Sequence, residues 1–362
     1  MSKKLRILID IGHPAHVHYF KNFIKIMQSK GHDFLIIARN KEITFSLLNT
    51  YQIPFISRGK GKNSLLGKIF YTFFADIYIL IKCIKWKPNI IMSFGTPYAA
   101  HSSKLYGIPH IAISDTEHAK LGILAFIPFT ETILTPDVYY NDLGEKQVKF
   151  KSYIEFTYLH KNYFNPITNI KKELNISESQ KFVIFRFVSW NASHDIGQKG
   201  IPYFLKLKLI KLFVDKGYRV LISSEGKLNT ELIKYQIKIA PEKIHSVIKA
   251  SDFFIGESGT MATEAAILGT PSVYINSLNA GVFDDEVKYK LLYSFRNTEG
   301  LYEKIIELLQ NPNLKLEHLN NLNTLVKEKI DITAFLVWFI ENYPDSKKAY
   351  IENPLIQNKF LN

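Results

Sequence analysis

Two hydroxyl residues and a glycine, Ser258, Gly259 and Thr260, lie where a short apolar run gives way to helix formers. The pattern predicts a strand over 252–255, a turn, and a helix over 260–268. The unpaired backbone N–H groups and the positive dipole end of such a helix bind phosphate or pyrophosphate, and both hydroxyls can add hydrogen bonds. We therefore expect a diphosphate group to bind here.

Glu264 lies further along the same expected helix. A carboxylate there can accept hydrogen bonds from the two hydroxyls of a ribose, and a carboxylate beside helix-bound phosphates is a common way to hold a nucleotide. The alternative is a Ser or Thr N-cap followed by a solvated glutamate. The pattern indicates a nucleotide-diphosphate site.

A second group of candidates follows two strands expected in the first half of the chain. His13 comes after the strand expected at 5–11, and Asp115 and Glu117 come after the one expected at 108–114. Ligands of parallel sheets bind beyond the carboxyl ends of the strands, so these residues are expected at one sheet edge. An imidazole or a carboxylate can accept a proton from a hydroxyl nucleophile, although each could instead cap a helix.

Polar residues also follow two strands expected in the second half, at 182–187 and 219–223. Short hydrogen-bond donors and one arginine suit phosphate oxygens, and a glutamate lines the same side. Each could instead have a core or turn role. These candidates are Arg186, Ser189, Asn191, His194 and Glu225.

Three histidines, His13, His16 and His18, lie within six residues. His16 and His18 project from different sides of a helix start, and no carboxylate triad accompanies them. We predict no metal site.

The chain has 362 residues, 46% of them hydrophobic, which is enough for two domains with full cores. Lysine and arginine exceed aspartate and glutamate by 46 to 33, and this excess favours anionic partners. No nucleic-acid motif is present, so we expect no nucleic-acid partner. The single cysteine, Cys83, excludes an internal disulfide, and the first apolar run is too short for a signal peptide, so a cytoplasmic protein is expected.

Strand-length apolar runs alternate with helical patterns along most of the chain, which predicts parallel sheets covered by helices. The alternation breaks over 148–170 and then restarts. We expect two Rossmann-like domains, an N-terminal one over 1–164 and a C-terminal one with closing helices over 165–343, followed by a tail over 344–362.

Residues 64–86 are almost wholly apolar, yet Lys68, Asp76 and Lys82 interrupt them. An acidic residue near the centre argues against a membrane-spanning helix. A helix buried on one face could rest on an anionic bilayer through 60–87, or it could simply cover the core. Basic residues frame the stretch: Arg58, Lys60, Lys62, Lys85 and Lys87.

These elements and motifs resemble the GT-B superfamily, which includes nucleotide-sugar glycosyltransferases and non-hydrolysing UDP-N-acetylglucosamine 2-epimerases. The segment S-G-T-M-A-T-E-A-A-I-L-G-T-P puts Ser258, Gly259 and Glu264 where that superfamily binds diphosphate and ribose. Gly12-His13 falls where the peptidoglycan N-acetylglucosaminyltransferase has its first glycine-rich loop. The run D-I-G-H-P-A-H-V-H-Y-F-K-N is similar to an uncharacterised bacterial and archaeal family of GT-B-like proteins. The resemblance implies an α/β fold of GT-B type, with two Rossmann-like domains facing across a cleft.

The chain also departs from these relatives. The epimerases have Arg-Pro-Glu in the first loop and Gly-Asp after the fourth strand, where this chain has His13-Pro14-Ala15 and Phe94-Gly95-Thr96. Many retaining GT-B transferases have two glutamates separated by seven residues, whereas Glu257 and Glu264 are separated by six.

The resemblance implies a glycosyltransferase that binds a UDP-linked sugar in the C-terminal domain and an acceptor in the N-terminal domain, without a metal or cofactor. His13 or Asp115 would deprotonate the acceptor hydroxyl, and cell-surface polysaccharide or glycolipid synthesis at the inner membrane face is the expected setting. One alternative is an epimerase that uses Asp115, Glu117 and His194 as acid and base. Another is a non-catalytic nucleotide-binding protein.

Overall fold

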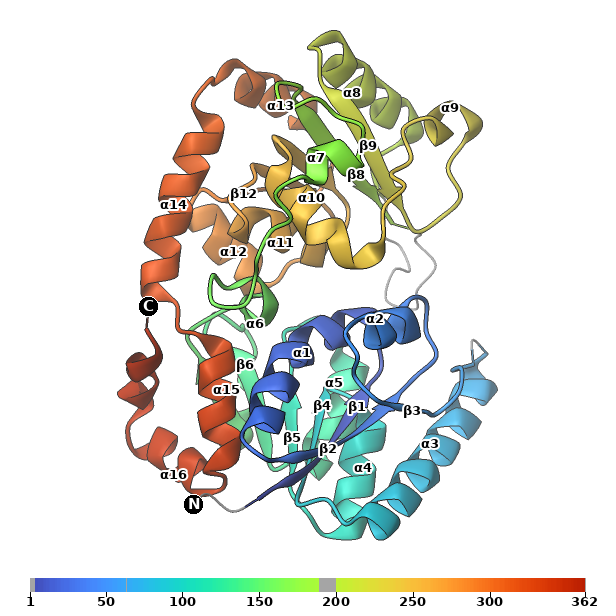
Figure 1. Cartoon of the computed structure of the whole chain (residues 1–362), viewed down its shortest axis with the longest axis vertical. Helices are drawn as coiled ribbons and strands as arrows, with labels where there is room; N and C mark the ends of the chain where they lie inside the picture. Colours follow the sequence, from blue (N-terminus) through green and yellow to red (C-terminus); the bar gives the residue numbers. More distant parts are fainter. Residues whose placement is uncertain (1–3, 63, 189–199, 362) are drawn as a thin grey trace. The chain divides into compact units, whose positions relative to one another are not determined.

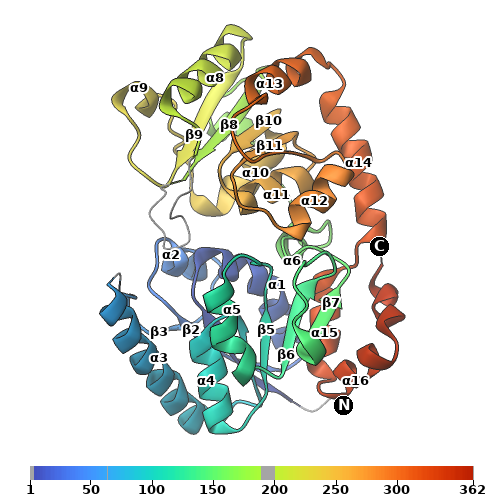
Figure 2. The same cartoon turned by 180° about the vertical axis from the view of Figure 1, so that it is seen from behind.

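The computed structural model describes residues 4–62, 64–188 and 200–361. It divides into two compact units, one of Met1–Tyr163 with Lys329–Asn362 and one of Phe164–Glu328. Each unit is a parallel sheet with helices packed on it (Figures 1 and 2). The expected α/β class is confirmed.

The first unit is built on a seven-stranded sheet of order β3-β2-β1-β4-β5-β6-β7. Its central strands are apolar runs buried on both faces, as parallel strands covered by helices must be. The strands are β1 Arg6–Ile11, β2 Asp33–Ala38, β3 Ile56–Ser57, β4 Ile90–Phe94, β5 His110–Ile113, β6 Thr132–Pro136 and β7 Gln147–Phe150. The helices are α1 Pro14–Ser29, α2 Thr44–Thr50, α3 Leu65–Trp86, α4 Pro97–Tyr106, α5 Lys120–Phe126, α6 Phe156–Leu159, α15 Ile332–Glu341 and α16 Asp345–Glu352. Short 3₁₀ turns cover Ile127–Phe129, Gly144–Lys146 and Pro354–Phe360.

The second unit has a five-stranded sheet of order β12-β11-β10-β8-β9. Its strands are β8 Phe182–Phe187, β9 Arg219–Ser224, β10 Phe253–Gly256, β11 Ser272–Ile275 and β12 Leu292–Phe295. Its helices are α7 Ile170–Glu173, α8 Tyr203–Asp215, α9 Thr230–Ile233, α10 Ile244–Ala250, α11 Gly259–Ile267, α12 Gly281–Lys288, α13 Leu301–Gln310 and α14 Leu314–Glu328, with a 3₁₀ turn at Pro241–Lys243.

The C-terminal residues correct the expected domain division. The expectation placed 329–343 with the second half and treated 344–362 as a tail, whereas 329–362 belong to the first unit. The helix α15 is apolar almost throughout, and it buries this surface against α1 and α6. Beyond it, α16 packs on β7, and the Tyr350 hydroxyl donates to the Lys149 carbonyl at 2.6 Å. The chain therefore returns to its first unit, where α1 and α6 offer an apolar surface for α15 to cover.

Candidate functional site

The helix α11 begins in the second unit where the sequence predicts a diphosphate site. Ser258 is its N-cap residue with extended backbone, and within the described residues its side chain forms no capping hydrogen bond. Ser258 and Gly259 are half-buried and Thr260 is exposed. The first-turn N–H groups of α11 therefore keep the capacity to bind an anion.

Close packing surrounds the turn between β10 and α11. A Cβ atom on Gly256 would lie 2.8 Å from Cβ of Arg186, and one on Gly259 would lie 2.5 Å from Cζ of Phe283. No real Cβ contact is that short, so any larger residue would displace these neighbours. The two glycines thus let the backbone pass between a β8 side chain and an α12 ring.

Arg186 lies at the carboxyl end of β8, in register with Ser223 on β9 and Gly256 on β10. Its Nη1 donates to Ser223 Oγ at 2.9 Å, and its Nη2 pairs with Glu225 Oε1 at 2.5 Å. Its Nε is buried and has no hydrogen-bond partner among the described residues. The structure therefore brings Arg186, Glu225 and the α11 turn to one edge of the second sheet.

Glu264 faces α10 from the buried side of α11. Its carboxylate is nearly inaccessible, and its Oε1 lies 2.9 Å from Nε2 of His245. No motif in the sequence marks this histidine, because it meets Glu264 only through the packing of α10 on α11. A ribose at Glu264 would share the carboxylate with His245, so the ribose role stays a prediction.

Three predicted donors, Ser189, Asn191 and His194, lie outside the described residues. Glu257 binds the backbone before and after these three residues. The sequence marks Glu257 only by its spacing from Glu264. Its Oε2 accepts from the Val188 N–H at 2.9 Å, and its Oε1 accepts from the Ile201 N–H at 2.7 Å. The Glu257 side chain is fully buried, and Lys206 Nζ lies 3.1 Å from Oε1.

Replacing Glu257 by alanine is expected to destabilise the second unit. One buried and one partly buried backbone N–H group would lose their acceptor, and the loss for a buried group costs about 1–3 kcal/mol. Urea unfolding should show a fall of at least about 2 kcal/mol in the free energy of unfolding, and a smaller fall for Glu257→Gln, which keeps one acceptor. Glu231→Ala on the exposed face of α9 is the control. Equal stability of Glu257→Ala and the parent would remove the anchoring role.

His13 is the N-cap residue of α1 in the first unit, which agrees with the alternative prediction that it caps a helix. Its Nδ1 accepts from the Ala15 N–H at 3.2 Å. Burial, with a contribution from Lys41, lowers the pKa of His13 to about 4. The neutral ring therefore carries its proton on Nε2, which makes it a hydrogen-bond donor towards a ligand in this geometry.

Asp115 follows β5 and is half-buried. Burial raises its pKa to about 6, although the Thr116 hydroxyl donates to its Oδ1 at 2.9 Å and opposes the shift. Such a pKa lies close to the range in which a general base works best. Of the residues predicted to accept a proton, Asp115 has the environment that suits it.

Glu117 is buried, and its Oε1 accepts from the Tyr140 N–H at 2.9 Å. This hydrogen bond ties the loop after β5 to the segment after β6. Glu117 thus supports the Asp115 loop through this bond, and its catalytic role stays a prediction.

The sheet register brings the loops that carry His13 and Asp115 to the same edge of the first sheet. Asp10 on β1 pairs with Ser93 on β4, and Ser93 pairs with Ala112 on β5. His13 and Asp115 each come three residues after members of this row, in the loops that follow β1 and β5. Both loops therefore leave the sheet at the same edge.

A buried ion pair that the sequence did not predict lies under the His13 loop. Asp10 and Arg58 are inaccessible, and they form two hydrogen bonds at 2.7 and 3.2 Å. Thr96 Oγ1 donates to Asp10 Oδ2 at 2.7 Å, and Arg58 Nη1 donates to Tyr71. The sequence groups Arg58 with the basic residues that frame 64–86, and the structure corrects this. The Arg58 guanidinium is buried and pairs with Asp10, so it is not available to a partner outside the fold. The only signal in the sequence is an aspartate within an apolar strand.

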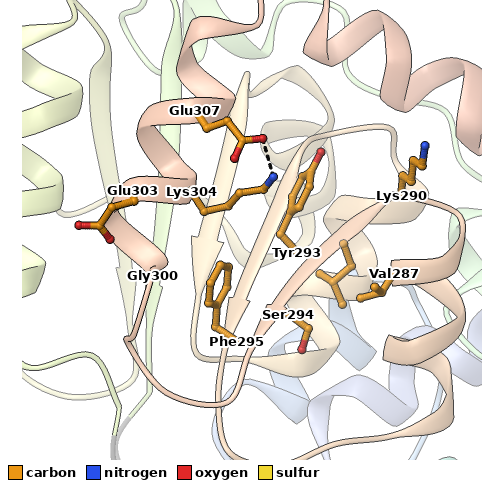
Figure 3. A pocket seen from close by; sticks show the side chains of 10 residues that line it. Val287, Lys290, Tyr293, Ser294, Phe295, Gly300, Glu303, Lys304 and Glu307 are labelled. Carbon is orange, nitrogen blue, oxygen red and sulfur yellow. Dashed lines mark hydrogen bonds and ion pairs between the residues drawn. The ribbon is translucent and has the colours of Figure 1, made fainter.

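The described residues also show no metal cluster, and one open groove lies apart from the predicted site residues. Among the described residues, no group of three or more His, Cys, Asp or Glu side chains could hold a metal ion. An open groove of about 770 Å³ lies between α12, β12 and α13, where Lys304 pairs with Glu307 at 2.6 Å (Figure 3). None of the predicted site residues lines it.

Comparisons with known proteins give a family and a fold. The model of the family described as "Protein of unknown function (DUF354)" matches residues 5–327. Uncharacterized protein MJ0665 of Methanocaldococcus jannaschii is 29% identical over 291 residues, which cover 74% of this chain and 81% of that protein.

Solved structures similar to this chain include glycosyltransferases and UDP-N-acetylglucosamine 2-epimerases. Staphylococcus aureus MnaA, solved with UDP, has a TM-score of 0.69 at 13% identity, over 94% of this chain and 97% of that one. The glycosyltransferase SsfS6 of Streptomyces sp. SF2575 has a TM-score of 0.57 at 12% identity, over 93% of this chain and 100% of that one. The chain therefore belongs to the family described as "Protein of unknown function (DUF354)", and its two parallel α/β units have the GT-B fold.

Proposed function

We propose that the protein is a glycosyltransferase that moves a sugar from a nucleotide-diphospho-sugar to an acceptor hydroxyl. The observation that carries this proposal is the N-terminus of α11, which has no side-chain cap within the described residues, with Arg186 beside the turn that precedes it. MnaA, which shares the fold, was solved with UDP, which supports a UDP-linked donor. In this proposal the donor binds to the second unit and the acceptor to the first. The reaction would take place in the cytoplasm, as a step in the synthesis of a surface glycan or glycolipid.

The proposed roles follow from the geometry of each residue. The α11 N–H groups, with Ser258 and Thr260, would stabilise the diphosphate as it leaves, without a metal. Asp115 would accept the proton of the acceptor hydroxyl, because its pKa of about 6 leaves it ionised at neutral pH. His13 would donate from Nε2 to the acceptor and orient it.

A sugar-nucleotide 2-epimerase is the second candidate, favoured by epimerases among the structures of the same fold. Its acid and base would be Asp115, Glu117 and His194. The buried bond of Glu117 to the Tyr140 N–H weighs against this, as does the His13-Pro14-Ala15 loop.

Incubation with a panel of UDP-sugars, with and without acceptor alcohols, separates the candidates. A transferase releases UDP in proportion to glycosylated acceptor, and an epimerase converts the sugar nucleotide with no acceptor present. A protein that only binds nucleotide consumes nothing. Epimer formation without acceptor would contradict the transferase proposal.

Glu264→Ala is expected to weaken UDP binding. A hydrogen bond to a charged group contributes about 1.5–3 kcal/mol, which corresponds to a rise in Kd of roughly 10- to 150-fold. The measurement is calorimetric titration with UDP, with circular dichroism to establish that the variant is folded.

Two variants serve as controls for this titration. Glu264→Gln keeps an acceptor for His245 and isolates the effect of charge, and Glu303→Ala removes an exposed glutamate on α13. An unchanged Kd in folded Glu264→Ala would separate Glu264 from the nucleotide.

A further inference from the structure

The outward face of α3 is apolar along its whole length. Helical spacing of three and four residues puts its exposed side chains on one stripe, which we call the α3 stripe. Phe70 is 73% exposed, Phe73 63% and Ile77 58%, and the three phenylalanines of the stripe together expose on the order of 400 Å². The stripe consists of Leu66, Ile69, Phe70, Phe73, Phe74, Ile77, Ile81 and Ile84. Monomeric soluble proteins seldom expose so large an apolar patch without a binding role.

The stripe lies at the free edge of the first unit. In Figures 1 and 2, no other element of that unit covers the outer side of α3. Its opposite side packs on α4 and buries Ala75, Ile79 and Cys83. The helix therefore does cover the core, as one expectation held, while its apolar surface continues on the outside.

A second exposed apolar element lies on α5, which packs on α4 as α3 does. His101 on α4 joins the two helices, since its Nδ1 lies 3.0 Å from Asp76 Oδ2 and its Nε2 lies 3.1 Å from the Ala125 carbonyl. On α5, Leu121 is 84% exposed and Leu124 is 64% exposed. The second apolar element follows directly after the Asp115 loop.

The charged residues in the chain segments that carry and follow the stripe are almost all positive. Residues 60–129 contain eight lysines, Lys60, Lys62, Lys68, Lys82, Lys85, Lys87, Lys104 and Lys120, and three acidic residues. Asp115 is half-buried and Glu117 is buried. The third, Asp76, is half-buried, and its Oδ2 lies 3.0 Å from Nδ1 of His101.

We infer that the α3 stripe, with Leu121 and Leu124, docks on the anionic face of a lipid bilayer. The apolar side chains would enter the interface between head groups and acyl chains, while the lysines face the anionic head groups. A second copy of this chain fits less well, because a dimer through this face would bring lysines against lysines. No helix in the described part of the chain is long and apolar enough to cross a membrane. The docking surface goes beyond the proposed transfer reaction and does not depend on it.

Vesicle flotation of the full chain tests this inference. The parent should float with vesicles of phosphatidylcholine and phosphatidylglycerol at low salt, and less at high salt or with phosphatidylcholine alone. Serine at Phe70, Phe73 and Ile77 should lower partitioning roughly a hundredfold or more. Glutamine at Lys60, Lys62, Lys68 and Lys82 should lower it by about fivefold for each lysine.

Phe204→Ser on α8 is the matched control, because that ring is 71% exposed in the second unit. It should float like the parent. A parent that stays in solution with anionic vesicles at low salt would overturn the inference. So would a dimer, seen by sedimentation velocity, that dissociates in the triple-serine variant. UDP titration of the same variants keeps the proposals distinct, since vesicle binding without UDP binding would contradict the proposed function alone.

Discussion

Asp115→Asn should lower the turnover of a UDP-sugar with its acceptor by roughly 10²–10⁴-fold, the contribution of a general base. The amide keeps the shape of the side chain and can still bond to Thr116, so the first unit should fold unchanged. UDP affinity should remain that of the parent, because the donor is assigned to the second unit. The measurement is steady-state kinetics beside UDP titration.

The pH profile distinguishes Asp115 from His13. A base must be deprotonated, so kcat/KM should fall as pH drops through the pKa of the base in the free enzyme. The inflection is expected near pH 6 for Asp115, and it would lie near pH 4 if His13 were the base. An inflection near pH 4, together with full activity of Asp115→Asn, would transfer the role to His13.

His13→Ala has a different expected signature. The loss of an orienting donor should raise KM for the acceptor and lower kcat, while the inflection near pH 6 stays in place. His13→Asn is the matched variant, since its side chain can still cap α1 by accepting from the Ala15 N–H. A variant with unchanged acceptor kinetics would leave His13 as a capping residue only.

Asp10→Ala is expected to destabilise the first unit by about 3–5 kcal/mol, because it leaves the buried Arg58 charge without a partner. Thr96 would lose its acceptor as well. Urea unfolding followed by tryptophan fluorescence is suited to this measurement, since Trp86 and Trp338 both belong to the first unit.

The chain supplies a matched control for the buried pair. Lys211 and Asp215 form an exposed pair on α8 at 3.0 Å, and Asp215→Ala should change stability by only about 0.3–0.5 kcal/mol. Replacing Asp10 and Arg58 together by Leu and Met should recover much of the loss, because no unpaired charge remains. If Asp10→Ala unfolds like Asp215→Ala, the buried pair does not hold the loops after β1 and β4.

The sequence alone determined the α/β class and most of the strands and helices. The strands 33–38 and 182–187 have the predicted bounds, and the turn into α11 lies within one residue of its expected place. These elements are marked locally, by apolar runs long enough to be buried on both faces and by the glycines that end them. The short edge strands β7 and β12 were missed, since Q-V-K-F and L-Y-S-F are partly exposed and too short to stand out from loops.

Only the tertiary structure decided which side chains meet. Arg58 pairs with a strand residue 48 positions away, and Glu257 holds the two ends of a segment through backbone N–H groups, which leave no mark in the sequence. The assignment of α15 and α16 to the first unit depended on their contacts with α1, α6 and β7, which are far away in the sequence. The sequence also left open whether the apolar side chains of α3 face the core or the outside. An apolar run indicates a surface that avoids water, but it does not indicate whether protein or lipid covers that surface.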